Sequence, residues 1–229
     1  MNRRALLGGA AAVTAGTAGC LTRLFEDGPE GVVLGPQADQ IAESDALSYP
    51  AYGQSMPTIS LPDPVGGITV DTEDLDRTAV YTTFFASCPA ECGILMGRLS
   101  AVQELVAERG LTEKTAFLPI TFDPDRDDAD ALRENADIYG VDLEAGNWHY
   151  LRPEDPDEAN RVVTEEFGLE FERDTGSDRL PGYDFTHVVL TTLVNPDGVV
   201  ERAYRGENLD HDRVADDIET VVEAFADRE

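Results

Sequence analysis

A run of apolar and β-forming residues at 79–85 leads directly into two cysteines and then into a helical pattern. Seven such residues in a row are typical of a strand that is buried on both faces, as in the middle of a parallel sheet. Pro89 and the periodic apolar residues after it predict a helix that ends at Gly110. The chain is thereby limited to folds with a buried strand–turn–helix unit that carries Cys88 and Cys92 at its turn.

The rest of the chain from residue 57 alternates short β-forming runs with amphipathic stretches. We expect strands at 58–61, 68–71, 116–122, 148–151, 187–194 and 199–204, and helices at 128–139, 155–167 and 209–226. The first two strands form a hairpin in this interpretation, and the last two are joined by the turn 195–198. This order predicts an α/β, thioredoxin-like fold with an N-terminal β-hairpin and a central sheet flanked by helices.

The N-terminus has the layout of an export signal. Arg3 and Arg4 precede 15 uncharged residues that end at Cys20, and this run is shorter than the roughly 20 residues of a membrane-spanning helix. The arginine pair is similar to a twin-arginine signal, and residues 17–20 are similar to a lipobox. We therefore expect a signal peptide at 1–19 and a lipid on Cys20 that holds the protein on the outer face of the cell membrane. A free cysteine after an ordinary signal is the alternative.

Two further regions follow the expected signal. Residues 20–56 contain scattered glycine, proline and serine without a sustained period, which is typical of a flexible tether. Residues 57–229 contain all the periodic segments and therefore form the expected domain. A chain of 229 residues has room for one such core and a tail.

The charge is strongly acidic, with 46 Asp and Glu against 17 Lys and Arg and a formal net charge of −29. Lys114 is the only lysine. This balance favours a protein from a salt-rich environment, because salt screens the repulsion between acidic groups. A cationic partner is the competing interpretation. A nucleic-acid partner is excluded, because phosphate binding needs a basic surface.

Cys88 and Cys92 carry the clearest chemistry. If Cys88 caps the helix and Pro89 is its first residue, Cys92 follows one turn later and both sulfurs lie on one face. The positive end of the helix then stabilises thiolate, the form that attacks disulfides and binds soft metals. Three interpretations stay open at this point: a structural disulfide, a redox-active dithiol and a metal site.

Three segments resemble the Sco/SenC family. Residues 81–92, YTTFFASCPAEC, are similar to its aromatic strand and CxxxC motif, and residues 120–127, ITFDPDRD, are similar to the segment after its next strand. Residues 183–187, YDFTH, with the turn at 195–198, resemble its histidine loop and hairpin. The resemblance covers about residue 57 to the C-terminus, and the three motifs occur in the family's order.

The resemblance implies a copper site formed by Cys88, Cys92 and His187, with Asp123 nearby as an acidic residue of the second shell. Two thiolates and one imidazole suit copper as Cu+, with Cu2+ as an additional form. The chain differs from the family pattern at Gly93, where proline is usual, and at Thr186, where aspartate is usual.

The function that the resemblance implies is a metallochaperone that delivers copper to the copper-receiving subunit of a respiratory terminal oxidase, cytochrome c oxidase. The alternative is an enzyme, a thiol–disulfide oxidoreductase or thiol peroxidase that acts through the redox dithiol of Cys88 and Cys92. A third interpretation, an extracytoplasmic copper or redox sensor, has no sequence feature of its own.

Overall fold

The computed structural model describes residues 29–173, 185–226 and 228. Its centre is a four-stranded mixed sheet in the order β4-β3-β7-β8. The strands of this sheet are β3 (Thr78–Phe84), β4 (Thr115–Thr121), β7 (Leu190–Val194) and β8 (Val200–Arg205). β3 pairs in parallel with β4 and antiparallel with β7, and every residue of β3 and β4 is buried. The predicted buried strand at 79–85 is therefore confirmed as a central strand of the sheet.

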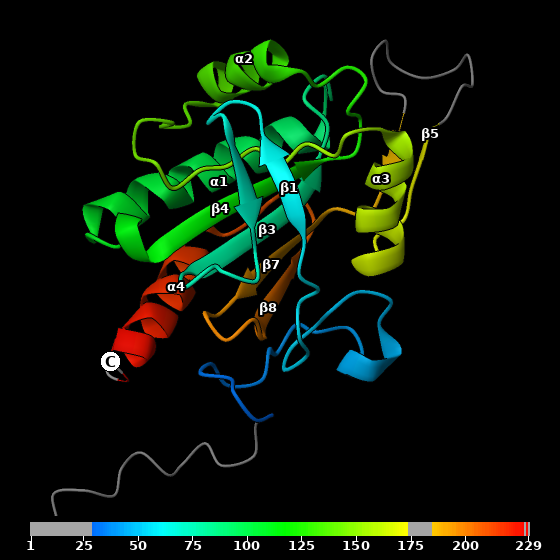
Figure 1. Cartoon of the computed structure of the whole chain (residues 1–229). Coiled ribbons are helices and arrows are strands. Elements are labelled where there is room, and N and C mark those ends of the chain that lie inside the picture. The colour runs from blue at the N-terminus through cyan, green and yellow to red at the C-terminus, as the bar shows by residue number, and fades with distance from the viewer. Residues whose placement is uncertain (1–28, 174–184, 227, 229) are drawn as a thin grey trace, which may run out of the picture.

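Helices cover both faces of this sheet. Figure 1 shows α1 (Glu91–Glu108) and α4 (His211–Ala226) on one face, and α3 (Pro156–Asn160) on the other. α1 buries one apolar side against the sheet, with Leu95, Leu99 and Val102 fully enclosed. The sheet with helices on both faces confirms the predicted α/β, thioredoxin-like architecture.

A two-stranded antiparallel hairpin precedes the central sheet. It consists of β1 (Ser60–Asp63) and β2 (Ile68–Asp71), and it confirms the predicted N-terminal hairpin. The buried carboxylate of Asp63 accepts hydrogen bonds from the backbone of Val65 and Gly66, which closes the turn. The hairpin lies across the face of the sheet opposite α1 (Figure 1).

The second helix, α2 (Ala129–Tyr139), begins and ends where the sequence predicts. Asp128 caps its N-terminus by accepting hydrogen bonds from two backbone N–H groups, a common way to satisfy the first turn. Gly140 ends it in the left-handed conformation with φ of 72°, which costs glycine little. Short 3-10 turns lie at Ser44–Ala46 (η1) and Thr112–Lys114 (η2).

Two predicted elements differ in detail from the structure. The strand expected at 148–151 is reduced to two isolated bridges, which join Trp148 and Leu151 to β4. The helix expected at 155–167 consists of α3 followed by a π-helical segment, η3 (Arg161–Glu166). Both segments still bury their apolar side chains, which is the property that the sequence pattern reports.

The strand expected at 187–194 is divided in the structure. Its first part belongs to β6 (Phe185–His187), which pairs with a three-residue strand that was not predicted, β5 (Phe171–Arg173). Only Leu190–Val194 joins the central sheet as β7. His187 therefore lies on a separate small hairpin and not at the start of a central strand.

The segment of residues 29–56, called the strap below, lies along the outer edge of β8. Gly53 donates a backbone hydrogen bond to Val200 (2.9 Å), and Val200 donates one to Gln54 (2.9 Å). An exposed edge strand invites pairing with other chains, and the strap covers this edge. The sequence predicted a flexible tether over 20–56, whereas its described part, 29–56, packs against the domain.

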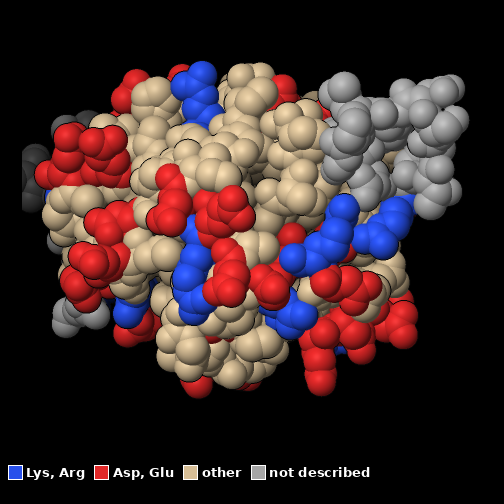
Figure 2. Space-filling view, turned by 90° about the horizontal axis from the view of Figure 1, so that it is seen from above, with Lys and Arg blue, Asp and Glu red and all other residues tan. Residues whose placement is uncertain are grey.

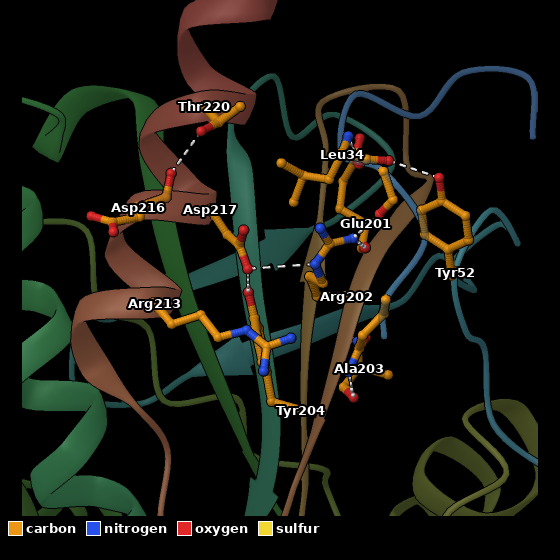
Figure 3. Close-up of polar contacts among 12 residues, drawn as sticks. Leu34, Tyr52, Glu201, Arg202, Ala203, Tyr204, Arg213, Asp216, Asp217 and Thr220 are labelled. Carbon is orange, nitrogen blue, oxygen red and sulfur yellow. Dashed lines mark hydrogen bonds and ion pairs between the residues drawn. The ribbon is translucent and has the colours of Figure 1, made fainter. Parts of the chain in front are cut away.

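Buried polar contacts hold the strap in place (Figure 3). The carboxylate of Glu201 accepts the backbone N–H groups of Val33 and Leu34 at 2.9–3.0 Å. Tyr52 donates to the carbonyl of Leu34 (2.7 Å), and Arg202 donates to the strap backbone while its Nε lies 3.5 Å from Asp217 of α4. Contacts between residues so far apart in the chain cannot be predicted from local composition.

Within the described residues, no helix combines the length and the apolarity that crossing a bilayer would need. The predicted signal peptide at 1–19 and the predicted lipid site at Cys20 lie outside the described residues, as do residues 20–28. Those predictions, and the limits of the domain at 57 and 229, stay predictions.

Candidate metal and thiol site

The loop between β3 and α1 carries both cysteines. Cys88 lies in this loop, where its backbone N–H donates to the carbonyl of Phe85 (3.2 Å). α1 begins at Glu91 with Ala90 as its N-cap, so the expectation that Cys88 caps the helix and Pro89 opens it was wrong. Cys88 instead belongs to the turn Phe85–Cys88, which precedes the helix. Cys92 is the second residue of α1 and still lies near the positive helix end.

The structure brings Cys92 and His187 together. The Sγ atom of Cys92 lies 3.6 Å from Nε2 of His187, although the two residues are 95 positions apart in the chain. Both cysteines are free thiols and almost fully buried, with exposed fractions of 4% for Cys88 and 2% for Cys92. Two of the three residues that the family resemblance implied as ligands are therefore in contact, and Cys88 lies in the loop that leads into the helix of Cys92.

The two thiols differ in their readiness to ionise. Hydrogen bonds from Cys92 and His187, and from the backbone N–H groups of Ala90 and Cys92, lower the pKa of the Cys88 thiol to about 5 although burial opposes this. The pKa of Cys92 is raised, because its proton is engaged with Cys88 and because the side chain is buried. Cys88 is therefore the more acidic thiol of the pair.

His187 is oriented by its surroundings. Its Nδ1 atom lies 3.4 Å from the carbonyl oxygen of Val188, which can only accept a hydrogen bond. Nε2, on the opposite side of the ring, is the atom that faces Cys92. The ring also packs against two aromatic rings, with centroid distances of 5.1 Å to Phe122 and 6.2 Å to Phe85. These contacts keep bulk water away from one side of the imidazole.

The distance between Cys92 and His187 fits a shared metal ion. Two ligands with bonds of about 2.3 Å to sulfur and 2.0 Å to nitrogen lie roughly 3.5 Å apart in tetrahedral geometry. Among the described residues, however, no three His, Cys, Asp or Glu side chains form a ready-made metal cluster. The donors are in place as hydrogen-bonded partners, and binding an ion replaces these hydrogen bonds by bonds to the metal.

Asp123 lies near this site but is engaged elsewhere. Its buried carboxylate forms ion pairs with Arg126 and with Arg173, the latter at 2.7 Å. The Arg173 guanidinium also lies over the ring of Phe185, 4.9 Å from its centroid. Arg173 and Phe185 belong to β5 and β6, so Asp123 ties the loop after β4 to the hairpin that carries His187.

Several residues of this region were not predicted as functional. Arg173 and Phe171 lie on β5, which is too short to produce a pattern in the sequence. Asp127 was part of the quoted motif at 120–127, but nothing in its spacing showed that its carboxylate would be buried beneath the cysteine loop. Asn135 had a weak signal, because it is a polar residue on the inward side of the amphipathic helix α2.

Asp and Glu are numerous on the face of the molecule that carries α2. Figure 2 looks at this side from above and shows Asp and Glu in several separate patches, with Lys and Arg between them and uncharged surface at the centre. No broad basic area is present on the described part of this face.

Comparisons with known proteins point to one family. The family model described as SCO1/SenC matches residues 64–223, which is more than half of the chain. The matched range includes the histidine segment 183–187 that was quoted from the sequence. The structure describes residues 185–187 of this segment. No curated protein matches the chain.

Solved structures of similar fold belong to the same family. A SCO1/SenC family lipoprotein from Bacillus anthracis has a TM-score of 0.61 at 18% identity, covering 73% of this chain and 94% of its own. BsSco, described as a member of the Sco family of cytochrome c oxidase assembly proteins, has a TM-score of 0.61 at 18% identity over 73% and 93%. ScoI of Bradyrhizobium japonicum with copper bound has a TM-score of 0.59 at 19% identity over 73% and 99%. At these identities the likeness shows the fold alone.

Proposed function

Because the chain belongs to the SCO1/SenC family, we propose that it binds copper(I) through Cys88, Cys92 and His187 and delivers it to a respiratory terminal oxidase. The observation that carries this proposal is the 3.6 Å contact between Cys92 and His187, close to the loop of Cys88, whose pKa is lowered. Two sulfurs and one imidazole nitrogen are a soft donor set, which prefers copper(I) to hard cations. Copper is the cargo in this account, not a resident cofactor.

The two thiols take different parts in binding. Cys88 has the lowered pKa, so it ionises more readily than Cys92 and forms the first bond to the ion. Cys92 holds its proton in the free protein, so its bond to the metal releases one proton to solvent. His187 then completes a three-ligand site through Nε2, and a site with three ligands can pass its ion on by ligand exchange. A weaker copper(II) complex at the same residues belongs to the same proposal.

The proposed partner is suggested by the descriptions of two relatives. BsSco is described as an assembly protein of cytochrome c oxidase, and ScoI of Bradyrhizobium japonicum has been solved with copper bound. We propose the copper-receiving subunit of such an oxidase as the recipient for this chain. A lipid on Cys20 would hold the protein at the extracytoplasmic face of the membrane, in keeping with the family lipoprotein from Bacillus anthracis.

A competition titration tests the proposal. The reduced protein, with Cys20→Ser to remove the third thiol, is titrated with copper(I) against a chromogenic chelator. We expect one tightly held ion per chain, at least a thousandfold weaker binding in Cys88→Ser, and about tenfold to a hundredfold weaker binding in His187→Ala. Binding that is undetectable in the parent protein, or unchanged in His187→Ala, would contradict it.

A second function is favoured by the unequal thiols. A low-pKa Cys88 thiolate beside a protonated Cys92 is the arrangement of a dithiol reductant. Cys88 would attack a partner disulfide and release one partner thiolate, which takes up a proton. Cys92 would then lose its proton and displace the second, leaving a Cys88–Cys92 disulfide that an external thiol reduces. Catalytic disulfide reduction that survives His187→Ala would favour this function over copper delivery.

A further inference from the structure

The chain segment that leads into Cys88 is held at Ala86 by two buried side chains. The backbone N–H of Ala86 donates to Oδ2 of Asp127 (2.9 Å), and its carbonyl accepts from Nδ2 of Asn135 (3.5 Å). Asp127 lies in the loop before α2, and Asn135 lies within α2. Both are inside the protein, with exposed fractions of 1% and 2%. The backbone of one residue, two positions before the first cysteine, is therefore held at both its N–H and its C=O group.

Neighbouring polar groups support these two side chains. The hydroxyl of Thr121 donates to the same Asp127 oxygen that receives Ala86. The hydroxyl of Tyr150 donates to Oδ1 of Asn135 (3.0 Å). Asn135 can therefore give its amide N–H to Ala86 only in this one orientation, since its oxygen is occupied by Tyr150. The network fixes which atoms face the cysteine loop.

A buried carboxylate at this place lowers stability. Only one oxygen of Asp127 is hydrogen-bonded, because Oδ1 has no partner in the described structure, and burial raises the pKa of the group to about 6. An apolar residue of similar size would avoid this desolvation. Polar groups retained at such a cost are a sign of a specific geometric or functional requirement. Ala86 contributes no side-chain chemistry, so the requirement concerns its backbone.

We propose that Asp127 and Asn135 are positioning residues that fix the backbone of Ala86 and thereby set the place of Cys88 relative to Cys92 and His187. Neither residue touches the sulfurs or the imidazole in this role. A rotation about the backbone bonds of Ala86 would displace the Sγ atom of Cys88, and metal–ligand distances tolerate only about 0.2 Å. Supporting residues of metal sites change affinity by tenfold to a hundredfold.

The test compares Asp127→Ala with Asp127→Asn and with a control at the other end of the sheet. Glu201→Ala is the matched control, because Glu201 is also a buried carboxylate that accepts backbone N–H groups, but from the strap. Three quantities are measured for each reduced protein: copper(I) affinity, the thiol–disulfide equilibrium of Cys88 and Cys92 with glutathione, and the unfolding transition. The parent protein carries Cys20→Ser throughout.

We expect Asp127→Ala to weaken copper(I) binding tenfold to a hundredfold and to change the thiol–disulfide equilibrium constant at least fivefold. Asp127→Asn should keep the copper(I) affinity and the thiol–disulfide equilibrium constant within about twofold of the parent values, because its amide oxygen can still accept a hydrogen bond from Ala86. Glu201→Ala should lower stability and leave both site quantities within twofold. Tyr150→Phe, which removes one hydroxyl from the support of Asn135, should change them in the same direction by about threefold.

Two results would overturn this inference. One is site quantities in Asp127→Ala that differ from the parent no more than those of Glu201→Ala. The other is failure of Asp127→Asn to rescue, which would show that charge and not the hydrogen bond matters. If Asp127→Ala does not fold, Tyr150→Phe decides by the same criterion. The copper(I) affinity measurement rests on the proposed function, whereas the thiol–disulfide measurement does not. A parent protein without copper(I) affinity therefore contradicts the proposed function and leaves the positioning role of Asp127 to be decided by the thiol–disulfide equilibrium.

Discussion

Two buried carboxylates, Glu201 and Asp127, lie at opposite ends of the central sheet and differ in how many of their oxygen atoms are hydrogen-bonded. Both oxygens of Glu201 accept hydrogen bonds, from the strap backbone and from Asn195 (2.7 Å). Asp127, at the end that carries the cysteines, uses one oxygen for Ala86 and Thr121 and leaves the other without a partner. The carboxylate of Glu201 is therefore fully hydrogen-bonded, whereas that of Asp127 retains one oxygen atom without a partner in the described structure.

This difference separates a structural role from a functional one. A carboxylate whose acceptors are all used fastens two parts of the chain together, as Glu201 fastens the strap to β8. A carboxylate left half satisfied inside the protein is tolerated where geometry near a reactive group matters more than stability. The following predictions test whether the two ends behave in this way, beginning with the largest expected effect.

Glu201→Ala should lower the free energy of unfolding by about 4 kcal/mol. The substitution leaves several buried N–H donors of the strap and of Asn195 without an acceptor, and each such donor costs roughly 1–3 kcal/mol. Water that enters the site recovers part of this loss. Denaturant unfolding at neutral pH measures the change. Limited proteolysis should at the same time cut within residues 29–56 more rapidly. The control Glu223→Ala, at an exposed position of α4, should change stability by less than about 0.5 kcal/mol.

Asp127→Asn should have an effect that depends on pH. The pKa of this carboxyl is raised from 3.8 to about 6, so the folded state holds its proton longer than the unfolded state and the parent loses stability between about pH 4 and pH 6. The asparagine variant lacks this loss. It should match the parent near pH 3.5 and exceed it by up to about 3 kcal/mol at pH 7. A stability difference that is the same at both pH values would contradict the buried, ionisable state of Asp127.

Gly93→Ala should lower stability by about 1 kcal/mol, because a Cβ atom at this position would lie 2.5 Å from the hydroxyl oxygen of Tyr139 and force that side chain to move. Gly97→Ala is the matched control in the same helix, where no atom lies within 4 Å of the added carbon. It should raise stability by roughly 0.5–1 kcal/mol. Thermal unfolding of the two variants gives the comparison, and equal changes would show that the site end is not crowded.

Arg173→Gln should have the smallest effect, a loss of about threefold in copper(I) affinity with a change in stability below about 1 kcal/mol. The substitution removes the ion pair with Asp123 and the contact with Phe185, which together hold the hairpin of His187. The loss should disappear in a His187→Ala background, as a double-mutant cycle can measure. Arg133→Gln, at an exposed ion pair of α2, is the control and should leave the affinity unchanged.

The main elements of the fold could be predicted because long apolar runs and amphipathic periods are local signals. Residues 79–85 were predicted as a buried strand and residues 116–122 as a strand, and β3 and β4 confirm them. The division of 187–194 could not be predicted, because it depends on pairing of β6 with β5, a strand of three residues. The packing of the strap was missed for a similar reason, since its contacts with β8 join residues more than 160 positions apart.

The candidate site was only partly accessible from sequence. Cys88, Cys92 and His187 were implied by the family resemblance, and the structure brings Cys92 and His187 into contact. The start of α1 at Glu91 was not predicted, because Phe85–Cys88 forms a turn closed by a backbone hydrogen bond and the helix begins two residues after Pro89. Asp127 and Asn135 act on a backbone group, and no residue pattern in the chain records such a contact.

The most direct test of the central claim is X-ray absorption spectroscopy of the copper(I)-loaded protein, with Cys20→Ser to exclude the third thiol. The account predicts a first shell of two sulfurs at about 2.3 Å and one imidazole nitrogen at about 2.0 Å, and loss of the nitrogen contribution in His187→Ala. A first shell made of sulfur alone in the parent protein, unchanged by His187→Ala, would contradict the ligand set of Cys88, Cys92 and His187.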